Sequence, residues 1–208
     1  MNKNKINTII YDCDGVLFDS EEAVLAYYDF ICEKFNLPKI QRDNHEEVKK
    51  ALMKTNEEII RMLTDNEMLI EKILEFAKNM NFKQFLNLMK PEKKLKETLN
   101  ILYNNGYNLA IFTNRGQSLH YLLDHFGLNK YFKIKITSFD VKNPKPNPEG
   151  IYKILDFFQI KPENALYIGD TTNDLYAAKN AKVMFVAYKN KLEDSPIIHN
   201  HMEILNFL

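Results

Sequence analysis

The segment 9–17 (IIYDCDGVL) constrains this chain most strongly, because an apolar, β-prone run ends there at two carboxylates. The apolar residues 9–11 are typical of a strand buried in a parallel sheet. Asp12 and Asp14 follow one residue apart, and Gly15 then allows the backbone to turn or to approach a ligand closely. Because ligands of open α/β sheets bind beyond the carboxyl ends of the strands, the sequence predicts a site at Asp12 and Asp14.

The spacing of the two carboxylates bears on their roles. Alternate side chains of a strand point to opposite faces, so Asp12 and Asp14 can act differently instead of sharing one proton. A strand end followed by an Asp-rich turn has the same local sequence, and the pair alone does not separate the two interpretations. Polar residues farther along the chain decide between them.

The composition favours one core domain with a modest insertion. With 208 residues the chain is somewhat long for one domain, and its 45% of hydrophobic residues can bury a substantial core. Lys and Arg together equal Asp and Glu together, at 28 each, and this argues against a nucleic-acid partner because such proteins usually carry a basic excess. Cys13 and Cys32 have neither metal-site nor disulfide-framework spacing, so we expect a reduced, cytoplasmic location.

The sequence predicts no membrane partner. No apolar run approaches the ~20 residues that a membrane helix needs, and the run behind the polar residues 1–5 is too short for a signal peptide. Near the C-terminus, His199 and His201 could bind a metal adventitiously, but a solvated tail is the expected structure.

Residues 17–90 carry helical periodicity and no strand signal. A first helix is expected to run to about residue 34, with Asp19 or Ser20 at its N-cap and Glu22 completing a capping box. Further apolar stripes fill 46–89. This segment therefore predicts a small helical domain inserted after the first strand.

From Pro91 onward helices and strands alternate, which predicts right-handed βαβ units and a parallel sheet. The fold class is accordingly α/β, with a core formed by 1–16 and 91–208. One helix is expected to have Asn147 at its N-cap and Pro148 at its first position. Strands are expected at 109–113, 132–137, 165–169 and 183–186, and helices at 95–103, 119–126, 148–158, 174–179 and within 197–207.

Polar residues follow several of these strands. Thr113 and Asn114 end the strand at 109–113, and Asp170 and Asp174 follow the strand at 165–169. Lys145 lies in a proline-rich loop after the strand at 132–137. The carboxyl ends of parallel strands meet at one edge of a sheet, so these side chains can converge on Asp12 and Asp14.

Such convergence would concentrate the negative charge of Asp12, Asp14 and Asp170 in one place, at a cost unless a cation neutralises it. Oxygen ligands alone favour a hard cation, and Mg²⁺ typically combines one or two carboxylates with waters and a substrate phosphate. The predicted cofactor is therefore Mg²⁺.

The remaining polar groups suit a phosphoryl group. The Thr113 hydroxyl, the Asn114 backbone amide and the Lys145 ammonium could bind its oxygens. Asp12 could attack phosphorus, and Asp14 could protonate the leaving oxygen and later deprotonate a water. Each group also has an ordinary structural explanation, such as helix capping, a solvated loop lysine or a turn aspartate; their shared position at one sheet edge favours the site.

Together these motifs resemble the phosphatase branch of the haloacid dehalogenase superfamily. Residues 12–16 (DCDGV) are similar to that family's first motif, Thr113 to its second and Lys145 to its third. Residues 169–174 (GDTTND) match the fourth, and order and spacing agree across nearly the whole chain. The resemblance implies a Rossmann-like core, with 17–90 as a helical cap that closes over the site and excludes water.

The resemblance also implies individual roles. Asp12 would be the nucleophile and Asp14 the general acid and base. Mg²⁺ would be held by Asp12, by the backbone carbonyl of Asp14 and by Asp170, with Asp174 supporting nearby. The phosphoryl group would be bound by Thr113 and Lys145, and Lys145 would also restrain the nucleophile.

The predicted function is that of a phosphatase acting on a small phosphorylated metabolite, phosphoglycolate-like or a sugar phosphate. The aspartate at 14 points to phosphate esters, because the family's dehalogenases and phosphonatases lack it. A phosphomutase of the β-phosphoglucomutase type, a non-enzymatic switch phosphorylated on Asp and a partner-binding pseudoenzyme are the alternatives. A monomer or weak homodimer is expected.

Overall fold

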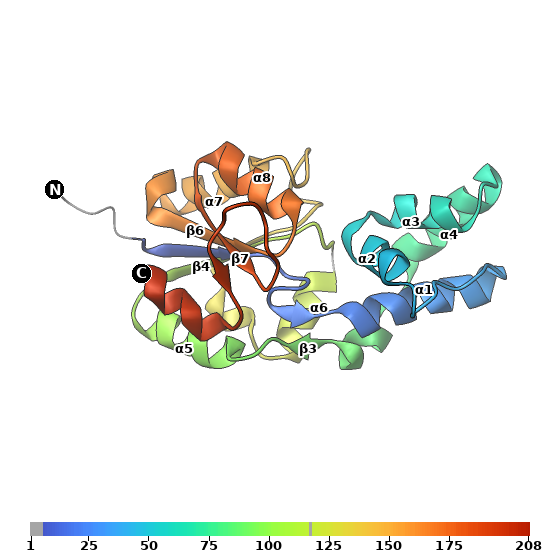
Figure 1. Ribbon diagram of the computed structural model, residues 1–208, viewed down its shortest axis with the longest axis horizontal. Coiled ribbons are helices and arrows are strands. Elements are labelled where there is room, and N and C mark those ends of the chain that lie inside the picture. The colour runs from blue at the N-terminus through green and yellow to red at the C-terminus, as the bar shows by residue number, and fades with distance from the viewer. Residues whose placement is uncertain (1–5, 117) are drawn as a thin grey trace. The chain divides into compact units, whose positions relative to one another are not determined.

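The computed structural model describes residues 6–116 and 118–208, which form two compact units (Figure 1). The first unit comprises the described residues up to Asp19 together with Pro91–Leu208, and the second comprises Ser20–Lys90. Where the chain passes from one unit to the other, β2 (Phe18–Asp19) and β3 (Lys90–Pro91) pair as a two-stranded sheet.

The first unit is built on a six-stranded sheet in which all neighbouring strands are parallel. Its order is β5-β4-β1-β6-β7-β8, so β1 lies between β4 and β6. Every residue of β1 and β6 is buried, as expected for strands covered on both faces. The strands are β1 (Thr8–Tyr11), β4 (Asn108–Phe112), β5 (Ile134–Ile136), β6 (Ala165–Gly169), β7 (Met184–Tyr188) and β8 (Ile197–Ile198).

Helices cover both faces of this sheet. Figure 1 shows α7 and α8 on one face, and α5 with the C-terminal 3₁₀ segment η4 on the other. Side chains from α7 and α8 pack against those of β1, β4 and β6 in one apolar cluster. The helical elements are α5 (Leu95–Asn104), α6 (Ser118–His125), η2 (Asn129–Tyr131), α7 (Glu149–Phe158), η3 (Pro162–Asn164), α8 (Thr172–Ala181) and η4 (His201–Phe207). The predicted α/β parallel-sheet core is thus confirmed.

Two details near the predicted helix ends differ from expectation. The helix predicted within 197–207 is a 3₁₀ segment, and the two-residue strand β8 precedes it. α7 begins one residue later than predicted, with Pro148 at the N-cap position. Asn147 still caps it in effect, because its Oδ1 accepts the amide hydrogen of Glu149 at 3.0 Å.

The predicted capping box at the start of α1 is wrong. Ser20 occupies the N-cap of α1 (Glu21–Phe35), but its side chain makes no capping hydrogen bond. Glu22 accepts instead from Arg42 Nη1 at 2.9 Å. The sequence match therefore indicated the place where the helix starts but not the contacts made there.

The second unit consists of helices between Glu21 and Leu88. After α1 come α2 (His45–Met53), α3 (Asn56–Leu63), α4 (Glu67–Asn79) and the 3₁₀ segment η1 (Phe82–Leu88). Its interior is mostly aliphatic, and the ring of Tyr27 packs edge-on against those of Tyr28 and Phe85 within it. The hydroxyl of Tyr28 donates to Asn56 Oδ1, while Asn56 Nδ2 donates to Tyr27 Oη. The role of residues 17–90 as a cap stays a prediction.

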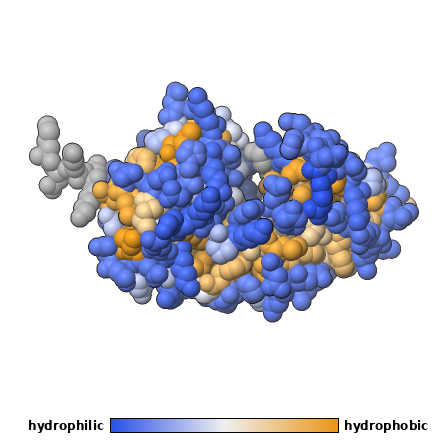
Figure 2. Space-filling view, turned by 60° about the horizontal axis from the view of Figure 1, so that its bottom comes forward, coloured by the Kyte–Doolittle hydropathy of each residue, from blue (hydrophilic) through white to orange (hydrophobic). Residues whose placement is uncertain are grey.

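On the face drawn in Figure 2, hydrophilic residues dominate the surface and apolar patches lie between them. No described helix combines the length and the apolar character that crossing a bilayer requires.

Candidate active site

The sheet brings the first predicted carboxylate into contact with Lys145. Asp12 directly follows β1, and its amide donates to the carbonyl of Ile168 in β6 at 2.9 Å, so the ladder continues to this residue. The side chain is buried, and its Oδ1 accepts a hydrogen bond from Lys145 Nζ at 2.6 Å. Two residues 133 positions apart in sequence thus form one buried ion pair.

Lys145 bridges two carboxylates. Its Nζ also donates to Asp174 Oδ1 at 2.6 Å, and all three side chains are buried. Asn114 fixes the lysine backbone: its Oδ1 accepts from the Lys145 amide at 3.0 Å, and its Nδ2 donates to the Lys145 carbonyl at 3.2 Å. Burial disfavours the charged ammonium, but the two carboxylates outweigh it and raise the pKa of Lys145.

Asp174 is held by four donors. Besides Lys145, the Tyr167 hydroxyl donates to its Oδ1 at 2.8 Å, and the amide and hydroxyl of Thr171 donate to its Oδ2 at 3.0 and 2.5 Å. Thr171 is the N-cap of α8, and the reciprocal bond between its hydroxyl and the Asp174 amide completes a capping box. Burial alone would raise the pKa of Asp174, but Lys145 and these hydrogen bonds hold it below its usual range.

A group of three carboxylates fits a hard cation. One oxygen from each of Asp12, Asp170 and Asp174 lies within 4.8 Å of the others. Asp170 Oδ1 is buried without a hydrogen-bond partner in the described part of the chain, so it is the oxygen most in need of a positive ligand. Asp174 already has its hydrogen-bond donors, so it suits a supporting role in the site better than binding the cation itself.

Burial and mutual repulsion raise the pKa values of Asp12 and Asp170. Burial, with repulsion from Asp174 and Asp14 added, raises the pKa of Asp12 to about 7, although Lys145 opposes the shift. Burial followed by the charges of Asp12 and Asp174 raises the pKa of Asp170 well above its usual range. One ammonium is therefore not enough for this cluster, and a cation would favour its ionised form.

The second carboxylate of the first motif has a partner that the sequence did not indicate. Arg115 Nε donates to Asp14 Oδ2 at 2.9 Å and its Nη2 donates to Oδ1 at 2.5 Å, a bidentate pair. Arg115 Nη1 donates to Ser118 Oγ at 3.1 Å, and its amide donates to Thr113 Oγ1 at 3.1 Å. Asp12 and Asp14 thus have different partners, as their alternation predicts.

Gly15 lies where a side chain would not fit. Its φ is +76°, and a Cβ built there would lie 2.1 Å from Asp170 Oδ2. The turn after β1 therefore touches the connection between β6 and α8, and a glycine at position 15 permits this close approach.

Of the predicted residues, the structure brings Asp12, Lys145, Asp170 and Asp174 together, with Asn114 on the Lys145 backbone and Gly15 against Asp170. The Asp14 carboxylate lies outside the three-carboxylate group, and the use of its backbone carbonyl as a ligand stays a prediction. Arg115, Tyr167 and Thr171 were missed. Of these three, only Arg115 offered a signal in the sequence, because it is a basic residue that directly follows the polar end of a predicted strand.

Comparisons with known proteins agree with this geometry. A family model described as haloacid dehalogenase-like hydrolase matches residues 9–188. The pyrophosphatase PpaX of Halalkalibacterium halodurans is 29% identical over 194 residues, covering 91% of this chain and 87% of that protein.

Solved structures are similar over nearly the whole chain. A haloacid dehalogenase-superfamily hydrolase of subfamily IA from Geobacter sulfurreducens is 36% identical, with a TM-score of 0.87 and coverage of 98% of this chain and 100% of that one. A predicted phosphoglycolate phosphatase from Haemophilus somnus shares the fold, with 22% identity, a TM-score of 0.78 and 97% of each chain covered.

Proposed function

Because the chain belongs to the haloacid dehalogenase-like hydrolase family, we propose that it is a Mg²⁺-dependent phosphatase acting on a small phosphorylated metabolite. The observation that carries the proposal is the contact of Lys145 Nζ with both Asp12 and Asp174, beside Asp170. A buried carboxylate restrained by an ammonium, next to a cluster that needs a cation, suits a nucleophile that attacks phosphorus.

In the proposed reaction a carboxylate oxygen of Asp12 attacks phosphorus and forms an aspartyl phosphate. The bond from phosphorus to the leaving oxygen breaks, and the protonated form of Asp14 supplies the proton that this oxygen takes, which leaves Asp14 as the carboxylate. Asp14 then removes a proton from the water that attacks the aspartyl phosphate, which releases phosphate and restores Asp12. The Thr113 hydroxyl and the backbone amide of Asn114 bind the phosphoryl oxygens, and Arg115 holds Asp14 in place.

Asp12 and Asp170, with the backbone carbonyl of Asp14, would hold Mg²⁺. The ion would neutralise the carboxylates and the charge that develops on the phosphoryl oxygens. Two observations support this assignment: Asp170 Oδ1 has no hydrogen-bond partner among the residues that the structure describes, and the pKa of both carboxylates is raised. Asp174 keeps its four donors and acts by holding Lys145.

We assign residues 17–90 the role of a cap that excludes water from the site. The relatives named pyrophosphatase and phosphoglycolate phosphatase support a small phosphorylated substrate whose identity the screen below determines. A reduced cytoplasmic location, a monomeric or weakly dimeric state and the absence of nucleic-acid and membrane partners belong to the same proposal.

The proposal is tested by a screen of phosphorylated metabolites with and without Mg²⁺, followed by Asp12→Asn on the best substrate. We expect phosphate release only with Mg²⁺, loss of turnover in Asp12→Asn, and a phosphoryl group on the Asp12 peptide after acid quenching of the wild type. Asp194→Asn, at an exposed carboxylate, is the control and should retain turnover. Full turnover by Asp12→Asn would exclude the covalent mechanism, and sugar phosphate isomerisation without phosphate release would indicate a mutase.

A further inference from the structure

The C-terminal segment η4 begins with a buried histidine, contrary to the expected solvated tail. His201 has none of its surface exposed, whereas His199 is exposed. The Nε2 of His201 lies 2.8 Å from the carbonyl oxygen of Val16, in the turn that follows β1. A carbonyl only accepts, so Nε2 carries the hydrogen and donates it to Val16.

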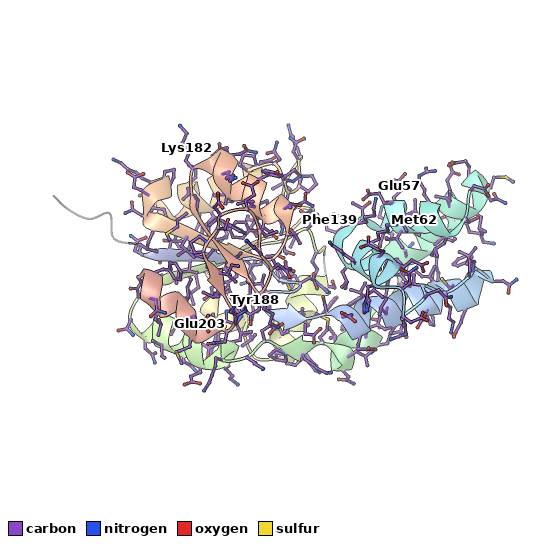
Figure 3. The ribbon with its side chains drawn as sticks, in the orientation of Figure 1. Glu57, Met62, Phe139, Lys182, Tyr188 and Glu203 are labelled. Carbon is purple, nitrogen blue, oxygen red and sulfur yellow. The ribbon has the colours of Figure 1, made fainter. Side chains whose placement is uncertain are left out.

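The surroundings of the ring favour its neutral form. It stacks on Tyr188 with ring centroids 4.8 Å apart and an interplanar angle of 23°, and it lies 5.7 Å from the Tyr11 ring. Figure 3 shows Tyr188 close to η4. Within residues 6–116 and 118–208, Nδ1 of His201 has no hydrogen-bond partner, so a cationic ring would bury a second N–H without an acceptor. Burial lowers the pKa of His201 to about 4.

The turn that receives this hydrogen bond is tight. The amides of Leu17 and Phe18 donate to the carbonyl of Cys13 at 2.9 and 3.1 Å, and the Gly15 amide donates to the Phe18 carbonyl at 2.8 Å. Within this turn Gly15 lies against Asp170 and the next residue accepts from His201. A shift of the Val16 peptide therefore moves the backbone that carries Asp14 and Gly15.

A second contact fixes the same turn and the ring that supports His201. The amide of Glu92 donates to the Leu17 carbonyl at 3.0 Å. The buried Glu92 carboxylate accepts from the Tyr188 hydroxyl at 3.0 Å and from Lys189 Nζ at 2.6 Å. Tyr188 is thereby held at both ends, by its strand and by its hydroxyl, and its face supports the histidine ring.

We propose that His201 is a positioning residue, whose Nε2–H fixes the Val16 peptide and so sets Asp14 and Gly15 against Asp170. Its effect on turnover rests on the phosphatase function proposed above, while its effect on the turn does not. His201 touches neither substrate nor cation in this proposal, and it acts through the backbone alone.

Two substitutions separate the hydrogen bond from the packing. His201→Phe keeps a ring against Tyr188 but removes the donor, and His201→Gln returns an N–H to the position of Nε2. On the best substrate we expect His201→Phe to lower kcat about tenfold to a hundredfold with little change in KM, because small displacements of catalytic groups slow chemistry more than binding. His201→Gln should recover most of the loss. His199→Phe, in the same segment, should match the wild type.

A measurement on the folded protein tests the contact without any turnover. In ¹⁵N NMR spectra of the wild type, the His201 ring should show the neutral Nε2–H tautomer without titrating between about pH 5 and pH 8. The Gly15 amide resonance should shift in His201→Phe and return in His201→Gln. A ring that titrates in this range, an unmoved Gly15 resonance, or equal kcat losses in both variants would overturn the proposal. If no phosphate ester is hydrolysed, the phosphatase function fails and the NMR result still decides the contact.

Discussion

Lys145 places one positive charge between two buried carboxylates, and the rest of the site adjusts to that arrangement. Its Nζ lies 2.6 Å from both Asp12 and Asp174, while Asn114 fixes its backbone from two sides. The side chain therefore reaches Asp12 from a loop that Asn114 fixes. Its ammonium also opposes the burial and the repulsion that together raise the pKa of Asp12.

Lys145→Met is expected to lower both activity and stability. It leaves Asp12 and Asp174 buried without their shared cation, and removing one partner of a buried ion pair typically costs about 3–5 kcal/mol. Urea unfolding should register that loss, and phosphate release should fall to background. Lys161→Met, at an exposed lysine, is the matched control and should change neither. A Lys145→Met protein as stable as the wild type would show that the pair contributes nothing net to folding.

The residues that sequence reasoning missed depend on distances in space rather than on local pattern. Arg115 is 101 positions from Asp14, and His201 is 185 positions from Val16. Asp12, Lys145 and Asp170 could be predicted, because strand ends of a parallel sheet meet at one edge. For His201, a single polar residue among polar neighbours gave no sign of burial, since burial comes from packing on Tyr188.

At the scale of elements, two helices begin with the same device. Thr171 forms a capping box with Asp174 at the start of α8, and Thr55 forms one with Glu58 at the start of α3. The first box also orients a carboxylate of the site, whereas the second lies on an exposed helix end. The same local chemistry thus serves the candidate site in only one of the two.

Thr171→Ala and Thr55→Ala are therefore expected to lower the free energy of unfolding in the same way but to differ in their effect on activity. Each removes an N-cap side chain, at a cost of about 1 kcal/mol. Only Thr171→Ala should also reduce kcat, because Asp174 loses a hydroxyl donor and holds Lys145 less firmly. Thermal melting and steady-state kinetics of both variants test this, and equal kcat values would separate the α8 cap from the site.

Secondary structure was predictable where burial or length left a strong pattern. The mostly apolar runs of β1, β4 and β6 and the periodic helices α5 and α7 were recognised. The two residues of β8 are too few to produce a period. The match at Asp19 and Glu22 had the capping-box spacing, but Arg42, which binds Glu22, decided the outcome through tertiary contact.

At the scale of the whole molecule, the site makes stability depend jointly on pH and on cations. Burial and neighbouring charge raise the pKa of Asp12 to about 7 in the folded chain and raise that of Asp170 as well. A raised pKa means that the folded state binds the proton more tightly than the unfolded state. This contribution is complete below the unfolded pKa and is lost as pH rises through the folded one.

Cation-free protein is therefore expected to lose Tm between about pH 5 and pH 7, and Mg²⁺ should restore it. The rise in Tm on adding Mg²⁺ should be larger at the higher pH, because the ion binds the deprotonated carboxylates. Thermal melts at both pH values with and without Mg²⁺ test this, and Asp170→Asn should lose most of the response. A Mg²⁺ effect equal in the variant would place the ion elsewhere.

The position of β1 in the sheet has a consequence for how the protein is made. Its neighbours are β4 and β6, so in a nascent chain leaving the ribosome one edge of β1 stays unpaired until Gly169 has emerged. The helices of Ser20–Lys90 have all their partners long before that point. Translation thus completes the helical unit while the strand that leads to Asp12 still lacks one of its two neighbours, and chaperones that bind apolar segments would act longest on that strand.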